Sequence, residues 1–183
     1  MAENAKRAAR PRRPAVFLDR DGVINVDRGY VASRADFKWI PGAIEAIKAL
    51  NDAGYYVFVA TNQSGIAHGL YTEREMQELH AYISRKLATS GARIDDWRHC
   101  PFHPEGTIEK FKRTSDWRKP GPGMILDLMK KWPIDRARSV LIGDKESDMG
   151  AARAAHVRGL RFSGGDLLAF VRAHVLSARP RPS

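Results

Sequence analysis

The most constraining feature of the chain is a short apolar run that ends in two carboxylates one residue apart. Ala15 to Leu18 is apolar, and Asp19-Arg20-Asp21 follows at once. Such runs are typical of strands buried in parallel sheets, and α/β folds place ligand chemistry at the carboxyl ends of those strands. Side chains at i and i+2 of a strand share a direction, so Asp19 and Asp21 would repel each other unless a cation joins them. A divalent metal with oxygen ligands fits, and the pair therefore indicates metal-assisted phosphoryl chemistry.

Strand-like runs alternate with helical patterns along the rest of the chain. The expected strands are 15–19, 55–62, 94–102, 139–144 and 160–162, and the expected helices are 41–53, 72–89, 122–132, 148–155 and 166–176. Thr72 and Glu75 form a capping box at the start of the second helix. Strands separated by helices predict an α/β fold with a doubly wound parallel sheet. The stretch between Asp21 and Asn62 is needed for a crossover helix, so no separate cap domain is expected.

Length and composition indicate one soluble domain. The chain has 183 residues, which suffices for one respectable core. Its single cysteine, Cys100, excludes an internal disulfide framework and suits a reducing compartment. No run approaches the roughly 20 apolar residues of a membrane span, and the apolar stretch after the basic N-terminus is too short for a secretory signal. We therefore expect a cytoplasmic protein, a monomer without membrane contacts.

The formal charge of +10 is concentrated at the two ends of the chain. Residues 1–13 and 178–183 carry more than half of it among several prolines, so we expect a disordered basic tail over 1–14, a single folded domain over 15–176 and a flexible tail over 177–183. A platform for single-stranded nucleic acid needs aromatic residues among the basic ones, and the N-terminal tail has none. Nucleic acid is therefore not expected as a partner, although a nucleic-acid-associated protein that acts on terminal phosphates stays as an alternative.

Three of the expected strands end in polar groups, and parallel strands bring such ends to one edge of the sheet. The first strand ends at Asp19 and Asp21, the second at Thr61 and the fourth at Asp144. Asp19 and Asp144 are predicted to clamp one hard cation. A carboxylate can also accept a phosphoryl group, while a second one donates and removes protons.

Neutral and cationic donors to phosphate follow in the sequence. Thr61 and the amides of Asn62, Gln63 and Ser64 offer neutral donors to phosphoryl oxygens. Lys119 balances the charge, since the segment R-K-P-G-P-G-M (118–124) leads into a helix N-terminus, a natural anion site. Taken alone, Asp144 and Asp148 are better explained as caps of the following helix, and only the combined set favours a site.

The combined set resembles the haloacid dehalogenase (HAD) superfamily of phosphatases. Its four motifs match in order over residues 15–148, at Asp19 and Asp21, at Thr61, at Lys119, and at Asp144 and Asp148. The resemblance implies that Asp19 is the nucleophile and Asp21 the general acid and base. It implies Mg²⁺ held by Asp19, the Asp21 backbone carbonyl and Asp144, with Asp148 as a supporting carboxylate. Thr61 and Lys119 would hold the phosphoryl group.

Longer stretches look like one subgroup, the D-glycero-D-manno-heptose 1,7-bisphosphate phosphatases. They are L-D-R-D-G-V-I-N-V-D-R-G-Y-V (18–31), T-N-Q-S-G-I-A-H-G (61–69), C-P-F-H-P-E-G (100–106), R-K-P-G-P-G-M (118–124) and I-G-D-K-E-S-D-M (142–149). The histidinol-phosphate phosphatases share L-D-R-D-G and T-N-Q but are less similar over 25–31. The likeness implies substrate contacts from Asp27, Arg28, Gly29, Tyr30, Thr61, Asn62, Gln63, Ser64, Arg118, Lys119 and Lys145.

These residues together predict a Mg²⁺-dependent phosphomonoesterase. The expected reaction removes the C7 phosphate of a heptose 1,7-bisphosphate through an aspartyl-phosphate, in the supply of nucleotide-heptose for lipopolysaccharide or capsule precursors. The alternative is a histidinol-phosphate or other small phosphomonoester phosphatase. Arg118 and Lys145 suit a bisphosphate, because a guanidinium grips an oxyanion with two hydrogen bonds and a lysine adds a point charge.

One part of the sequence departs from the subgroup. Its members commonly carry a zinc loop of the form C-x-H…C-x-C, and the matching positions here are Cys100, Phe102, Ser115 and Trp117. Cys100 alone is retained, so structural zinc is not expected, because such sites prefer four Cys or His ligands. A site of His99, Cys100, His103 and Asp116 can be drawn but is not favoured. Phe102 and Trp117 are expected to hold the loop by apolar packing instead.

Three further histidines have no predicted role. His68 follows the T-N-Q-S-G motif and is expected to be a solvated loop residue. His80 lies within a predicted helix and His156 directly follows one, and both are expected on the protein surface.

Overall fold

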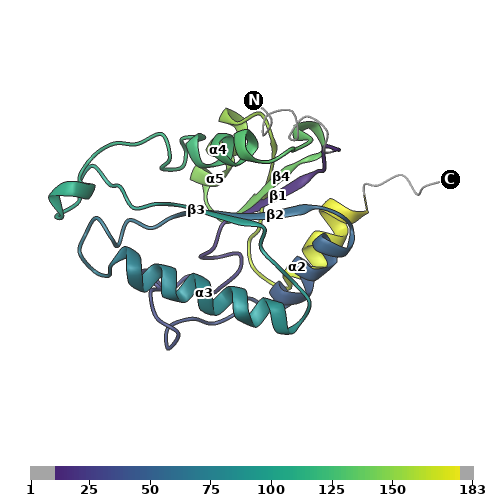
Figure 1. The fold of residues 1–183 in the computed structure, drawn as a ribbon, viewed down its shortest axis with the longest axis horizontal. Helices are drawn as coiled ribbons and strands as arrows, with labels where there is room; N and C mark the ends of the chain where they lie inside the picture. Colours follow the sequence, from purple (N-terminus) through teal and green to yellow (C-terminus); the bar gives the residue numbers. More distant parts are fainter. Residues whose placement is uncertain (1–10, 178–183) are drawn as a thin grey trace, which may run out of the picture.

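A computed structural model describes residues 11–177 and shows one parallel sheet with helices on both faces (Figure 1). The sheet has the order β3-β2-β1-β4-β5. Its strands are β1 (Ala15–Leu18), β2 (Tyr56–Asn62), β3 (Asp96–Cys100), β4 (Val140–Gly143) and β5 (Arg158–Arg161). All four pairings between neighbours are parallel, which confirms the predicted α/β class.

The helices fall close to their expected positions. They are α2 (Ala43–Asp52), α3 (Glu73–Thr89), α4 (Gly123–Lys131), α5 (Glu146–Ala154) and α6 (Leu167–Val171), with two 3₁₀ turns, η1 (Glu109–Phe111) and η2 (Arg136–Arg138). The Thr72–Glu75 capping box at the start of α3 is confirmed. The last expected helix, 166–176, is divided, because α6 gives way to a π-helical segment, η3 (Arg172–Leu176).

The alternation of side chains along β1 creates two cores. Val16 and Leu18 belong to the larger core, together with residues of α2, α3 and α6. Ala15 and Phe17 point the other way and belong to a core with residues of α4 and α5. Figure 1 shows the same division, with α2 and α3 on one side of the sheet and α4 and α5 on the other. Both faces are therefore covered, which explains why β1 and most of β2 are buried throughout.

The central position of β1 places the motifs together. β1 pairs with β2 on one side and with β4 on the other, so the carboxyl ends of these three strands are adjacent. Among residues 11–177 no cap domain is inserted, and loops after β1, β2 and β3 flank this edge. No helix in the same range is long and apolar enough to cross a membrane.

Most of the expected tails, residues 1–10 and 178–183, lies outside the described residues. Arg13 is described, and its Nε donates to the carbonyl of Gly54 at 2.9 Å while its guanidinium covers the ring of Tyr56. The domain boundaries at 14 and 177 stay predictions.

Candidate active site

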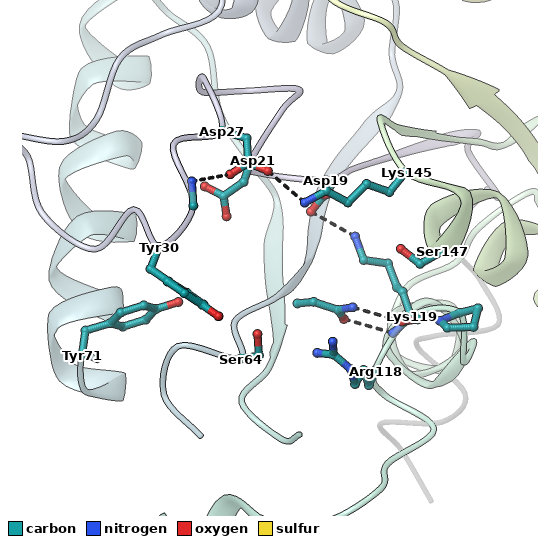
Figure 2. Close-up of a pocket in the computed structure, with 13 residues that line it drawn as sticks. Asp19, Asp21, Asp27, Tyr30, Ser64, Tyr71, Arg118, Lys119, Lys145 and Ser147 are labelled. Carbon is teal, nitrogen blue, oxygen red and sulfur yellow. Dashed lines mark hydrogen bonds and ion pairs between the residues drawn. The ribbon is translucent and has the colours of Figure 1, made fainter. Parts of the chain in front are cut away.

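An open pocket of about 610 Å³ lies at the carboxyl ends of the central strands (Figure 2). It is lined by Asp19, Asp21, Asp27, Gly29, Tyr30, Asn62, Ser64, Tyr71, Arg118, Lys119, Pro120, Lys145 and Ser147. Ten of these thirteen residues were predicted from the sequence. The pocket therefore joins four segments that are far apart along the chain.

Asp19 lies at the centre of the site. Its backbone N–H donates to the Ile142 carbonyl at 3.0 Å and prolongs the β1–β4 ladder, which fixes the side chain at the strand end. Its Oδ1 accepts from the Arg20 backbone N–H at 2.8 Å and lies 3.0 Å from Lys119 Nζ. Burial raises the pKa of Asp19 to about 7, against the opposing attraction of Lys119. The carboxylate is thus desolvated, and a neighbouring cation favours its charged form.

Lys119 joins two carboxylates. Its Nζ contacts Asp148 Oδ1 at 2.5 Å, and its side chain is buried. Figure 2 shows its second contact, with Asp19. Burial alone would lower the pKa of Lys119, but the two carboxylates raise it, so the ammonium stays charged. Asn62 holds the backbone of Lys119 in place with two hydrogen bonds, one donated and one accepted.

A group of three carboxylates is suited to a metal ion. Asp19, Asp144 and Asp148 each offer an oxygen within 4.8 Å of the others. Asp148 is already engaged, because its oxygens accept from Lys119 Nζ and from the Lys145 backbone N–H. Asp144 differs, since its buried Oδ1 has no hydrogen-bond partner among the described residues. Burial also raises the pKa of Asp144, as expected for a carboxylate that needs a cation. Asp19 and Asp144 therefore fit a divalent cation, with Asp148 behind them.

Gly22 opens the space beside Asp144. Its φ of +88° lies in the left-handed region, and a Cβ there would collide with Asp144 Oδ2. Only glycine satisfies both conditions without moving the carboxylate.

Asp21 is held from three directions. Arg20 Nη2 lies 3.1 Å from both of its oxygens. Asn25 Nδ2 donates to Oδ1 at 2.9 Å, and Gln63 Nε2 donates to Oδ2 at 3.0 Å. The carboxylate lines the pocket beside Asp19 in a fixed orientation.

The outer part of the pocket carries the predicted substrate residues. Lys145 Nζ donates to Asp27 Oδ2 at 2.8 Å, and Asp27 Oδ1 accepts from the Gly29 backbone N–H (Figure 2). Arg118 Nη1 is buried and has no hydrogen-bond partner among residues 11–177. Tyr30 is exposed at the rim. Two cationic side chains therefore flank a volume large enough for a sugar phosphate.

Not all the predicted residues line the pocket. Arg28 is exposed and lies outside the lining set. Thr61 and Gln63 are buried and do not line the pocket either. The Nε2 of Gln63 donates to Thr61 Oγ1 at 2.9 Å. Asp144 lies on a neighbouring pocket of about 360 Å³, together with Gly22 and Arg161.

Sequence reasoning missed Tyr71, Pro120 and Ser147, which also line the pocket. Pro120 and Ser147 lie inside motifs already singled out, so proximity to those motifs was an available signal. The sequence around Tyr71 carried no such signal, because Tyr71 is an ordinary loop residue before the α3 capping box. Its hydroxyl donates to Gln63 Oε1 at 2.5 Å.

The prediction that His80 lies on the surface was wrong. His80 is 8% exposed, and its ring stacks on Trp97 with centroids 4.3 Å apart. The spacing of the buried residues of α3 explains this, since 76, 79, 80, 83 and 87 lie on one helical face. His156 is exposed as predicted, and His68 is half-buried beside His103.

The loop that replaces the zinc loop is held by apolar contacts. Cys100 is buried in a small cluster with Ala60 and Met124, and Phe102 and Trp117 pack against it. Arg113 lies 3.8 Å above the ring of Phe102. Among residues 11–177 no His, Cys, Asp and Glu group suited to a metal is found in this loop.

Known proteins are similar to this chain in sequence and in fold. A family model described as HAD-hydrolase-like matches residues 116–166. A D-glycero-beta-D-manno-heptose-1,7-bisphosphate 7-phosphatase of Rhodopseudomonas palustris is 54% identical over 90% of this chain and 92% of its own length. The protein of the same name from Escherichia coli K12 is 46% identical over 79% of this chain and 75% of its own length.

A solved structure of a protein with the same kind of name is also similar to this chain. The D,D-heptose 1,7-bisphosphate phosphatase of B. bronchiseptica, complexed with magnesium and phosphate, has a TM-score of 0.75 and 31% identity, and the match covers 93% of this chain and 89% of the other. The identity and the coverage together show the family: this chain belongs to the heptose 1,7-bisphosphate phosphatases of the HAD-like hydrolases.

Proposed function

We propose that the protein is a Mg²⁺-dependent phosphatase that removes the C7 phosphate of D-glycero-D-manno-heptose 1,7-bisphosphate. The observation that carries this proposal is the placement of Asp19 between Lys119 and the Asp144 carboxylate, in a chain that is 54% identical to a phosphatase of that name. The contacts of each residue support a specific role in the reaction.

Asp19 is the proposed nucleophile. One of its oxygens is fixed by Lys119 and by the Arg20 backbone N–H, which leaves the other to attack phosphorus. Attack forms an acyl-phosphate bond to Asp19 and breaks the bond between phosphorus and the sugar oxygen. Lys119 stabilises the negative charge of the phosphoryl oxygens, and Thr61 and the amides after it supply further donors.

Asp21 is the proposed general acid and base. In the first half of the reaction its proton passes to the leaving sugar oxygen. In the second half it removes a proton from the water that attacks the phosphorus of the aspartyl-phosphate, which releases inorganic phosphate and restores the Asp19 carboxylate and the protonated Asp21. The three hydrogen-bond donors around Asp21 aim its carboxylate for both steps.

The residues that would hold Mg²⁺ are Asp19, Asp144 and the backbone carbonyl of Asp21, supported by Asp148. When bound, the ion neutralises charge on the transferring phosphoryl group. The partnerless Oδ1 of Asp144 and the space that Gly22 leaves beside it support this assignment.

Arg118 and Lys145 are the proposed contacts for the second phosphate. Both line the pocket, and Arg118 Nη1 has no protein partner among residues 11–177 to give up. Asp27, Gly29, Tyr30, Asn62 and Ser64 would surround the sugar. We further propose that the protein acts as a cytoplasmic monomer, which size-exclusion chromatography with light scattering would test for the oligomeric state.

The deciding experiment compares three substrates, namely heptose 1,7-bisphosphate, heptose 1-phosphate and histidinol phosphate, each with Mg²⁺ and with EDTA. Phosphorus NMR identifies which phosphate leaves the bisphosphate. We expect release of the C7 phosphate, a clear preference for the bisphosphate, and no turnover in EDTA or in Asp19→Asn. Equal turnover of histidinol phosphate would overturn the substrate, and activity retained by Asp19→Asn would overturn the mechanism.

A further inference from the structure

A fully buried arginine lies directly behind the catalytic edge. Arg20 has no exposed surface and follows the nucleophile Asp19 in the chain. The one carboxylate within ion-pair distance of its guanidinium, among residues 11–177, is that of Asp21. An arginine keeps its charge at all ordinary pH values, and a buried charge is costly unless it is paired and hydrogen-bonded. The hydrogen bonds and the ion pair of Arg20 must therefore offset the cost of burying its charge.

The guanidinium is anchored on the side away from Asp21. Its Nη1 lies 3.2 Å from Nε2 of His80, and its Nη2 donates to the Val31 carbonyl at 2.5 Å. Because the guanidinium can only donate, Nε2 of His80 must accept, and the imidazole is neutral with its proton on Nδ1. Burial, and secondarily the nearby charges of Arg20 and His99, lower the pKa of His80 to about 2, in agreement with a permanent acceptor.

The imidazole itself cannot easily move. His80 belongs to α3, whose apolar face packs into the larger core, and its ring stacks on Trp97 of β3 at an angle of 22°. The contact thus links α3 and β3 to the end of β1 through Arg20. No residue of this link reaches the pocket except Asp21.

We propose that Arg20, anchored by His80, is a positioning residue that fixes the Asp21 carboxylate for proton transfer to the leaving group, an inference that rests on the proposed phosphatase function. The carboxylate is held between Arg20 on one side and Asn25 and Gln63 on the other. Arg20 supplies the contact to both oxygens, which sets the direction in which the carboxylate faces. A lysine would keep the charge but lose the fork that spans both oxygens and the second nitrogen that reaches His80.

The test uses the intact chain and two substrates that differ in the leaving group. The alkoxide that leaves a sugar phosphate needs a proton, whereas the phenolate that leaves 4-nitrophenyl phosphate does not. Rapid-quench measurements give the rate constant for phosphorylation of Asp19 by each substrate. In Arg20→Lys we expect this constant to fall about 100-fold for the sugar phosphate, the size of effect typical of lost general acid catalysis. It should change less than about threefold for 4-nitrophenyl phosphate, because that step uses no acid.

Two variants of His80 separate positioning from folding. His80→Leu removes the acceptor, and we expect an intermediate loss of roughly tenfold with the same dependence on the leaving group. His80→Gln restores an acceptor oxygen and should recover most of that loss. If Arg20→Lys fails to fold, this pair still decides the question. Inhibition by inorganic phosphate should be unchanged in every variant, since Thr61 and Lys119, and not Asp21, are the proposed phosphate contacts.

Arg98→Lys is the matched control. Arg98 is another arginine with carboxylate partners, Asp96 and Asp127, but it is only partly buried and lies outside the pocket. We expect a comparable loss of thermal stability and wild-type phosphorylation rates. Equal losses on both substrates in Arg20→Lys, or no loss on either, would overturn the positioning role while wild-type turnover still supports the phosphatase. A wild-type chain inactive on both substrates would overturn both proposals.

Discussion

The ends of β1 and β4 and the loop after β3 lie on the same edge of the sheet but are built in different ways. The first region, here called the charged edge, consists of Asp19, Lys119, Asp144 and Asp148. Lys119 is buried between Asp19 and Asp148, and the half-buried Asp144 offers an oxygen within 4.8 Å of those of both carboxylates. The second, the apolar loop support, consists of Cys100, Phe102 and Trp117, which are held by apolar packing. A buried charge is satisfied only by specific partners at short distance, whereas a loop can be fixed by any contacts that bury enough area. Function should therefore depend sharply on the charged edge and loosely on the loop support.

The largest effect is expected for Lys119→Met. The substitution leaves two buried carboxylates without their shared cation, so we expect a loss of about 3 kcal/mol in the free energy of unfolding. Turnover should fall on the order of 10³-fold, because a phosphoryl-stabilising charge is lost. Phosphate release and thermal unfolding measure the two effects. Lys131→Met is the control, since it makes the same change at a lysine that also has a carboxylate partner, Asp96, but whose side chain is more than half exposed. Similar losses in both variants would show that the charged edge has no special role.

Gly22→Ala tests the charged edge without changing any charge. The new methyl group would collide with Asp144 Oδ2, and a displaced carboxylate should weaken activation by Mg²⁺ and lower turnover by about 100-fold. Gly54→Ala is the control, because Gly54 also has a positive φ, at 82°, but has nothing within 4 Å of its Cβ position. The measurement is turnover against Mg²⁺ concentration. The same Mg²⁺ dependence in both variants would contradict the proposed role of Asp144.

Trp117→Ala tests the apolar loop support. Trp117 is partly buried, so the expected cost is about 2 kcal/mol of unfolding free energy, below that of a fully buried tryptophan. We expect turnover of the folded protein to stay within about threefold of wild type, because Trp117 does not line the pocket. Denaturant unfolding and steady-state kinetics measure both. A loss of turnover as large as that of Lys119→Met would show that function depends as strongly on the apolar loop support as on the charged edge.

The smallest effect concerns pH and the histidine behind the charged edge. His80 stays neutral in the folded state, with a pKa of about 2 against 6.5 in the unfolded chain, so the unfolded state binds more protons below pH 6.5. Its contribution to stability is present above pH 6.5 and is lost as the pH falls, by about 1 kcal/mol over the first pH unit. Unfolding free energies at pH 6.5 and at about 5.5 measure this loss, which His80→Gln should abolish. His156→Gln, at an exposed position, should leave the loss unchanged.

Much of the fold followed from local patterns. The apolar run before Asp19 and the capping box at Thr72 predicted β1 and the start of α3, because a strand buried on both faces and a capped helix each have a short-range signature. The division at Val171 between α6 and the π-helical η3 was not predicted, since the pattern of apolar residues does not distinguish the two kinds of helix.

The candidate site, like the fold, could be predicted from the sequence only in part. By itself, the sequence determined which residues we propose to carry the chemistry, because Asp19, Asp21, Lys119 and Asp144 lie at strand ends or in short motifs, where packing or helix capping alone would not require all four. Only the tertiary structure decided how they are supported. His80 and Tyr71 look like any histidine or tyrosine in a helix or loop until their partners are known. A polar side chain can be solvated or buried at the same sequence position, and only the groups that the folded chain places against it make burial favourable.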